Sequence, residues 1–231
     1  MVKRKVAVFD VDGTIFRSSL FIELTEELID AGVFDAGVRK RYAKEKQAWL
    51  ERKGEGDYEA YVTAIVHAFT EALQGVHYGD FQDAAKRVAA HHANRTYRFT
   101  RDLVKSLLER GYFLLAISHS PKPIVEHFCR KLGFHKVYGM IYDLGPKDRF
   151  TGEVQDLHLI SNKANILKRA LEKENLTLAG SVGVGDTESD IPFLELVSKP
   201  ICFNPNKRLY RYGKRMGWKI VVERKDVIYE L

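Results

Sequence analysis

Two aspartates that directly follow a short apolar segment near the N-terminus constrain the fold and the chemistry most. Val6–Phe9 is typical of a buried strand, and it leads into Asp10-Val11-Asp12-Gly13-Thr14. Carboxylates so close together repel each other unless a cation or a proton lies between them. An Asp-Gly turn with a solvated acidic neighbour is the structural alternative, but this motif is rare in chains of average composition. The motif therefore predicts a site for cations or protons at the end of a strand.

Short apolar segments alternate with helical patterns over most of the remaining chain. Near-continuous apolar strands are typical of a parallel sheet covered on both faces, and the alternation predicts a doubly wound, Rossmann-like α/β fold. The segment 137–154 differs, because a Gly145–Asp148 turn separates two extended halves, and it predicts a β-hairpin. The other expected strands are Val6–Phe9, Tyr112–Ile117, Val182–Val184, Pro200–Phe203 and Trp218–Val222, and the expected helices are Arg101–Glu109, Ile124–Leu132, Ala164–Leu171 and Ile191–Leu196.

Residues 17–98 contain helical patterns and no convincing strand. Apolar residues recur there at helical spacing in four segments, which predicts a four-helix insertion. The expected domains are therefore an α/β core of residues 1–16 and 99–231 and a helical insertion of residues 17–98. An α/β sheet binds its ligands at the carboxyl ends of its strands. Because the insertion leaves the sheet just after Asp12, we expect it to form a cap over that site.

Three further polar clusters stand next to predicted strands or helices. Ser118-His119-Ser120 follows a strand, and a hydroxyl there can bond a phosphoryl oxygen or cap the next helix. Lys163 opens a helix, where a cation opposes the helix dipole unless an anion lies nearby. A third cluster, Gly183–Asp190, follows another strand and contains Asp186 and Asp190. Asp190 has an alternative role as the N-cap of the helix that begins at Ile191.

We expect these clusters to meet at one edge of the sheet. The four aspartates Asp10, Asp12, Asp186 and Asp190 would carry a charge of −4 there. That charge cannot persist beside a dianionic phosphate without cations, so Lys163 and a divalent ion are implied. Ligands that are all oxygen, with no clustered cysteine and histidine set, favour Mg²⁺ over Zn²⁺.

Phe9-Asp10-Val11-Asp12-Gly13-Thr14-Ile15 resembles the nucleophile motif of the haloacid dehalogenase superfamily of phosphatases and phosphotransferases. Ser118, Lys163 and Gly185-Asp186-Thr187-Glu188-Ser189-Asp190 resemble its other three motifs, and the insertion resembles the helical cap of the phosphoserine-phosphatase-like branch. The resemblance implies that Asp10 is the nucleophile and that Asp12 is the acid and base. It also implies metal ligation by the Asp10 and Asp186 carboxylates and the Asp12 carbonyl, with Asp190 acting mostly through water, and phosphate binding by Ser118 and Lys163.

Three motifs depart from the phosphoserine phosphatase pattern, one of them the fourth, which tends to have Asn before its last Asp where this chain has Ser189. Those enzymes carry a cap glutamate that meets the substrate's amino group, where this chain has Ser18 and Ser19. Their second motif usually reads Ser-Gly-Gly, where this chain has His119 and Ser120 after Ser118. We therefore expect a different small phosphomonoester, with Ser18, Ser19 and His119 as candidate substrate-binding residues. Two alternative functions remain open, a phosphoserine phosphatase proper and a phosphotransferase, because both share these motifs. The sequence gives less support to nucleic-acid binding or to a noncatalytic role.

Charge and composition limit the classes of binding partner that the chain can have. The net charge of +6 suits a phosphate-bearing substrate, nucleic acid or an anionic membrane. Basic residues are dense only at Arg39–Arg41 and Lys207–Arg215, which we interpret as solvated helix faces because no nucleic-acid-binding motif accompanies them. No apolar segment approaches the roughly 20 residues that span a bilayer. Two separate cysteines are typical of a reducing compartment. The expected protein is cytoplasmic and binds a small phosphorylated metabolite, with no membrane partner, and nucleic acid is the less favoured partner.

Overall fold

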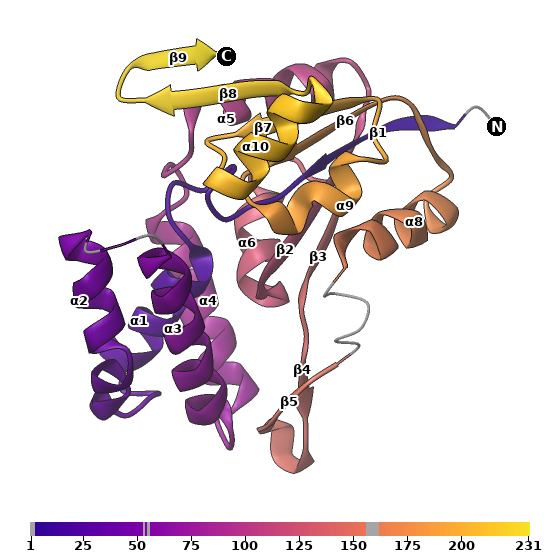
Figure 1. Cartoon of the computed structure of the whole chain (residues 1–231). Coiled ribbons are helices and arrows are strands. Elements are labelled where there is room, and N and C mark those ends of the chain that lie inside the picture. Colours follow the sequence, from indigo (N-terminus) through magenta and orange to yellow (C-terminus); the bar gives the residue numbers. More distant parts are fainter. Residues whose placement is uncertain (1–2, 53, 55, 156–161) are drawn as a thin grey trace. The chain divides into compact units, whose positions relative to one another are not determined.

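The computed structural model describes residues 3–52, 54, 56–155 and 162–231, which divide into two compact units (Figure 1). The first unit comprises Met1–Ser19, His92–Met140 and Asp156–Leu231, and the second comprises Leu20–His91 and Ile141–Gln155. The predicted insertion of residues 17–98 is longer at both ends than the helical segment Leu20–His91 of the second unit. The hairpin, which was expected in the core, groups with the helices. Within the described residues, no helix is long and apolar enough to cross a membrane.

The first unit contains a seven-stranded sheet of strand order β3-β2-β1-β6-β7-β8-β9. Every neighbouring pair is parallel except β8 and β9, which are antiparallel. Because β2 lies on one side of β1 and β6 lies on the other, the chain changes direction at β1, where open α/β sheets bind their ligands. The strands are β1 (Arg4–Phe9), β2 (Phe113–Pro121), β3 (Lys136–Met140), β6 (Leu176–Gly185), β7 (Lys199–Phe203), β8 (Lys219–Arg224) and β9 (Val227–Glu230).

Helices cover both faces of this sheet (Figure 1). One face packs against α8 (Lys163–Lys173), α9 (Ile191–Leu194) and α10 (Lys207–Met216) in a single apolar cluster that includes Val8, Leu115, Leu167, Phe193 and Leu209. The helices α5 (Arg98–Glu109) and α6 (Lys122–Arg130) lie behind the sheet in this view. The buried strand β1 reads Val6-Ala7-Val8-Phe9 because both of its faces are covered. The predicted doubly wound α/β fold is confirmed.

The second unit contains four α-helices, two 3₁₀ helices and a short hairpin among its described residues. Phe69 occupies its centre, and its ring contacts those of Phe21, Phe34, Phe81 and Tyr142. The helices are α1 (Leu20–Asp30), η1 (Ala36–Arg41), α2 (Ala43–Glu51), α3 (Asp57–Leu73) and α4 (Tyr78–His91).

The predicted hairpin is present but shorter than expected. β4 (Tyr142–Leu144) pairs antiparallel with β5 (Phe150–Val154) across the 3₁₀ turn η2 (Pro146–Asp148). The first part of the expected hairpin, Lys136–Met140, is instead β3 of the parallel sheet. An edge strand that is only half-buried alternates apolar and polar residues as a hairpin strand does, so the pattern could not separate them. Phe150 packs on Tyr78 and Phe81, which explains why the hairpin groups with the helices.

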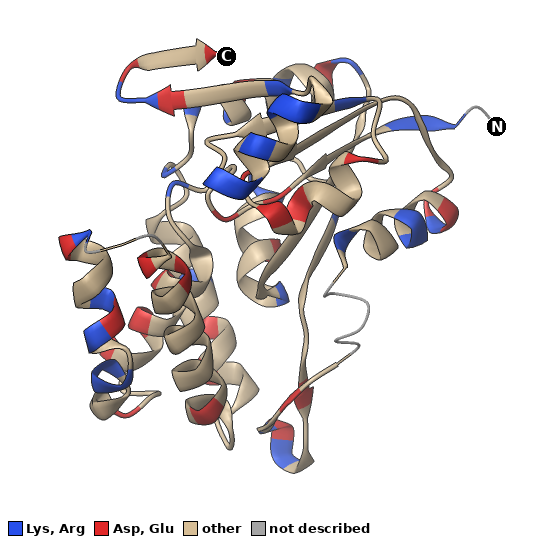
Figure 2. Ribbon diagram, in the orientation of Figure 1, with Lys and Arg blue, Asp and Glu red and all other residues tan. Residues whose placement is uncertain are grey.

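Both basic segments singled out in the sequence lie on helices (Figure 2). On η1, Arg39 pairs with Glu26 and Asp30, and Arg41 pairs with Glu71. On α10, Arg208 pairs with Glu188. Acidic side chains thus lie beside these basic residues, as expected for solvated helix faces that carry mixed charge.

Candidate active site

Three strands of the first unit end where the predicted polar clusters begin. Asp10 follows β1, Ser118 lies near the end of β2, and Asp186 follows β6. Since β1 pairs in parallel with both β2 and β6, these three ends share one edge of the sheet. Lys163 lies in the first turn of α8, whose N-cap Asn162 accepts a hydrogen bond from the Ala164 N–H. The structure therefore brings all four clusters together.

Asp10, Lys163 and Asp190 form a buried charge cluster. The Lys163 Nζ atom lies 2.5 Å from Asp10 Oδ1 and 2.6 Å from Asp190 Oδ1, and all three side chains are at most 7% exposed. An unpaired buried charge is costly, so each member of the cluster depends on the others. Lys163 thus separates two carboxylates, and the nearby anions offset its unfavourable position in the first turn of a helix.

Asp190 is held in place on both of its oxygens. Its Oδ1 accepts from Lys163, and its Oδ2 accepts from the backbone N–H groups of Asp186 and Thr187. Gly185 permits this arrangement, because a Cβ atom there would lie 2.5 Å from the Asp190 side chain. Asp190 stands at the N-cap position of α9 but makes no side-chain cap bond to that helix. Its carboxylate therefore links Lys163 to the loop that carries Asp186.

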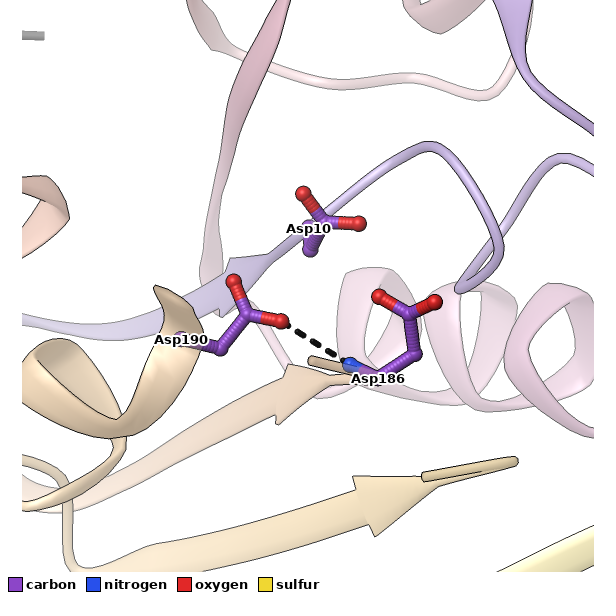
Figure 3. Close-up of side chains that lie close together, drawn as sticks. All are labelled: Asp10, Asp186 and Asp190. Atoms are coloured by element: carbon purple, nitrogen blue, oxygen red, sulfur yellow. Dashed lines mark hydrogen bonds between the residues drawn. The ribbon is translucent and has the colours of Figure 1, made fainter. Parts of the chain in front are cut away.

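Asp186 faces Asp10 across a narrow space (Figure 3). Carboxylate oxygens of Asp10, Asp186 and Asp190 all lie within 4.8 Å of one another, a spacing that suits a metal ion. Gly13 has φ +78° and lies so close to Asp186 that a Cβ atom there would be 2.1 Å from its Oδ2. The glycine of the first motif is thus needed both for the turn and for this approach.

The electrostatics of the cluster favour a bound cation. Burial raises the pKa of Asp10 to about 7, with Asp190 and Asp12 adding to the shift and Lys163 opposing it. Burial and the Asp10 charge raise the pKa of Asp186 well above its ordinary value. Burial alone would lower the pKa of Lys163, but the Asp10 and Asp190 carboxylates outweigh it and raise that pKa. The positive charge of Lys163 therefore compensates the negative charge of these carboxylates only in part.

Asp12 is bound by two serine hydroxyls. Ser118 Oγ donates to Asp12 Oδ2 at 2.7 Å, and Ser120 Oγ donates to the same oxygen at 2.8 Å. Capping of the next helix was the alternative role for this cluster, but the Ser120 hydroxyl bonds Asp12, and Pro121 occupies the N-cap position of α6. The signal that could have revealed this role is the spacing, because residues two apart on a strand share a face.

The three candidate substrate-binding residues lie on segments adjoining this edge. The Ser18 carbonyl accepts a hydrogen bond from the Gly13 N–H at 3.0 Å and closes the loop after the first motif. Ser19 is buried, whereas His119 is exposed between Ser118 and Ser120. Substrate binding by Ser18, Ser19 and His119 stays a prediction.

A comparison with known proteins identifies the family. The profile of the haloacid dehalogenase-like hydrolases matches residues 7–195, and the chain belongs to this family. The chain is 24% identical to the inhibition of morphological differentiation protein of Streptomyces azureus, over 94% of this chain and 78% of that protein. It is also 24% identical to a histidinol-phosphatase of Neisseria meningitidis, over 94% of this chain and 98% of that protein.

Solved structures share the fold of this chain. The fold is similar to that of a phosphoserine phosphatase determined as a phospho-aspartyl intermediate analogue, with a TM-score of 0.64 and 22% identity. The match covers 97% of this chain and 96% of that one. The predicted family is confirmed, as is the prediction of an enzyme of the phosphatase type. The fold is similar to that of a phosphoserine phosphatase, a member of the branch that the sequence resembles.

Proposed function

We propose that this protein is a Mg²⁺-dependent phosphomonoester hydrolase that acts through an aspartyl-phosphate on a small phosphorylated metabolite. The observation that carries the proposal is the pairing of two aspartates with separate partners. Asp10 is bound to Lys163, and Asp12 is bound to Ser118 and Ser120. One carboxylate is thus positioned beside a cation that attracts phosphate, and the other is oriented to transfer a proton.

In the first step of the proposed reaction, Asp10 attacks phosphorus in line. A bond forms between the Asp10 carboxylate oxygen and phosphorus while the ester P–O bond breaks. The electron pair of that bond goes to the leaving oxygen, which takes a proton from the Asp12 carboxyl group. Lys163 and the Ser118 hydroxyl stabilise the charge on the phosphoryl oxygens, because fixed charges and donors supply most of the catalysis in phosphoryl transfer.

In the second step, water releases the phosphate. Asp12, now a carboxylate, accepts a proton from the attacking water. The new bond forms between the water oxygen and phosphorus, and the electron pair of the aspartyl-phosphate bond returns to Asp10. Both aspartates then have their starting protonation states, so the cycle is closed without any further reactant.

The residues present fit Mg²⁺. The donor set consists of carboxylate oxygens of Asp10 and Asp186, with the Asp12 carbonyl as a further oxygen ligand, and hard oxygen ligands suit this ion. Burial raises the pKa values of Asp10 and Asp186, and the neighbouring carboxylates add to the shift, so a bound cation would favour their charged forms. Bound Mg²⁺ would neutralise phosphoryl charge in this site. Asp190 accepts hydrogen bonds from Lys163 and from two backbone N–H groups, and it thereby holds the loop that carries Asp186 in place.

These pKa shifts predict that Mg²⁺ stabilises the fold more at neutral than at acidic pH. Asp10 and Asp186 have raised pKa values in the metal-free folded state, which therefore binds more protons than the unfolded state above about pH 4. The free energy of unfolding then falls as the pH rises towards 7. Because Mg²⁺ replaces those protons, its stabilising effect should grow over the same range. We expect Mg²⁺ to raise Tm by about 3–5 °C more at pH 7.5 than at pH 5.

Thermal unfolding of dialysed, metal-free protein with and without Mg²⁺ measures this effect at each pH. Asp186→Ala is the matched variant, since it removes a proposed ligand and should abolish the pH-dependent part of the shift. An equal Mg²⁺ effect at pH 5 and pH 7.5 in the native protein would contradict the proposed ligand set.

Phosphoserine is not the substrate that the site favours. The resemblance to phosphoserine phosphatases places Ser18 and Ser19 where those enzymes carry a glutamate for the substrate's amino group. Neutral hydroxyls cannot supply the ion pair that would compensate an ammonium group for the loss of its water. The related histidinol-phosphatase shows that a protein of similar length and sequence can act on another phosphate ester.

We therefore expect phosphoserine to rank below other phosphomonoesters in a substrate panel. The panel compares kcat/KM for phosphoserine, histidinol phosphate, sugar phosphates, glycerol phosphates and nucleotides, with phosphate release as the readout. An added alcohol tests transfer to an acceptor other than water. A tenfold or larger preference for phosphoserine, about 1.4 kcal/mol, would overturn the specificity proposal. Absence of turnover with every phosphomonoester would overturn the proposed function itself.

A further inference from the structure

Two hydroxyl groups converge on a single oxygen of the proposed acid and base. Ser118 Oγ and Ser120 Oγ both donate to Asp12 Oδ2, at 2.7 Å and 2.8 Å. Both serines are at most 2% exposed. Each serine hydroxyl has one proton to donate, so neither can bond a second acceptor while it bonds Asp12. The Ser118 oxygen also accepts from the Ser120 N–H at 2.9 Å, which links the two serines.

This arrangement conflicts with the role proposed for Ser118 unless another group holds Asp12. Ser118 cannot donate its hydroxyl proton to a phosphoryl oxygen and to Asp12 at the same time. When a phosphoryl group draws that proton away, Ser120 is the serine that still bonds Asp12 Oδ2. The need for two serines is explained if one bonds the substrate and the other keeps the carboxyl group oriented.

We propose that Ser120 is a positioning residue that holds Asp12 for proton transfer while Ser118 binds the phosphoryl group. The inference rests on the proposed function, since it concerns how Asp12 performs its step. With substrate bound, the Ser120 hydroxyl still donates to Oδ2 and keeps that oxygen an acceptor, so the transferred proton resides on Oδ1. In the first step this proton passes from Oδ1 to the leaving oxygen as the ester P–O bond breaks. In the second step Oδ1 recovers a proton from water.

A positioning role of this kind predicts a dependence on the leaving group. An alkoxide needs protonation as it leaves, whereas p-nitrophenolate is a stable anion and needs little. Small errors in the placement of an acid reduce catalysis strongly. Ser120→Ala should therefore lower kcat/KM for the best alkyl phosphate of the panel by roughly 10- to 100-fold. The same variant should lower kcat/KM for p-nitrophenyl phosphate by less than about threefold, because that ester depends little on Asp12 in the first step.

Two further variants at this position separate the hydrogen bond from side-chain volume. Ser120→Cys keeps a side chain of similar size but offers only a weak S–H donor, so we expect it to behave like Ser120→Ala. Ser120→Thr retains the hydroxyl and should restore the ratio between the two substrates to within about threefold of the wild type. Circular dichroism and Tm establish that each variant is folded.

Ser181→Ala is the matched control. Ser181 is also a fully buried serine of the first unit, but its hydroxyl donates to the Leu178 carbonyl, outside the cluster of site residues. Its loss should change both substrates by the same small factor. Equal losses for the two substrates in folded Ser120→Ala, or no loss at all, would overturn the positioning role. Asp12→Asn separates a failure of the positioning role from a failure of the proposed function. Substantial activity of this variant on the alkyl phosphate would show that Asp12 is not the acid and base, and would overturn the proposed function.

Discussion

Replacing Asp10 with asparagine should lower kcat by about 10⁴-fold or more while the protein stays folded. Asparagine matches aspartate in shape, but its amide is a poor nucleophile and cannot form an aspartyl-phosphate. The substitution removes one of the carboxylates around Lys163 and leaves Asp190 paired with that lysine at 2.6 Å. Burial raises the pKa of Asp10, so its charge is costly in the metal-free fold and its loss should not unfold the protein.

Steady-state turnover of p-nitrophenyl phosphate measures this effect, with Tm as the test of folding. Asp102→Asn provides the matched control, because Asp102 is an exposed aspartate of α5 that pairs with its neighbour Arg101. That variant should retain wild-type turnover. Substantial turnover by folded Asp10→Asn would show that another group is the nucleophile.

Removal of the metal should have an effect of similar size. After exhaustive EDTA treatment and dialysis we expect activity of about 1% or less, and added Mg²⁺ should restore it. Ca²⁺ should bind the same oxygens but support little turnover, because its larger and more flexible coordination suits in-line transfer poorly. Asp186→Ala should raise the Mg²⁺ concentration needed for half-maximal activity by about tenfold or more, since it removes a proposed ligand.

Glu188→Gln is the control for this series. Glu188 lies two residues after Asp186, but its carboxylate bonds Arg208 and Asn206 rather than the cluster of Asp10, Asp186 and Asp190. Its Mg²⁺ dependence should match that of the wild type. Full activity of the native enzyme after metal removal would contradict the role given to Mg²⁺.

The position of the site could be predicted from the sequence because each cluster follows a strand of one parallel sheet. Asp10, Ser118 and Asp186 come directly after apolar segments or at their ends, and parallel strands bring such ends to one edge. The burial of Lys163 between Asp10 and Asp190 could be anticipated only in part. Its position in the first turn of a helix indicated a nearby anion, but which carboxylates it contacts depends on the packing of α8.

Other features depend on contacts that a local pattern does not contain. The spacing of Ser118 and Ser120 indicates only that they share a face of the strand, and the bond from Ser120 to Asp12 joins residues 108 positions apart. The assignment of β3 to the main sheet rests on its pairing with β2, since its own residues resemble a hairpin strand. The hairpin groups with the helical unit because Phe150 packs on aromatic side chains of α4. Short segments with an ambiguous pattern are decided by such tertiary contacts.

The covalent step at Asp10 is tested most directly by trapping the intermediate. The enzyme is mixed with a ³²P-labelled phosphomonoester, quenched in acid during turnover, reduced with borohydride and digested for peptide sequencing by mass spectrometry. We expect acid-stable label on the protein before reduction and conversion of residue 10 to homoserine afterwards, with neither change in Asp10→Asn. Label on another residue, or rapid turnover with Asp10 never modified, would contradict the account.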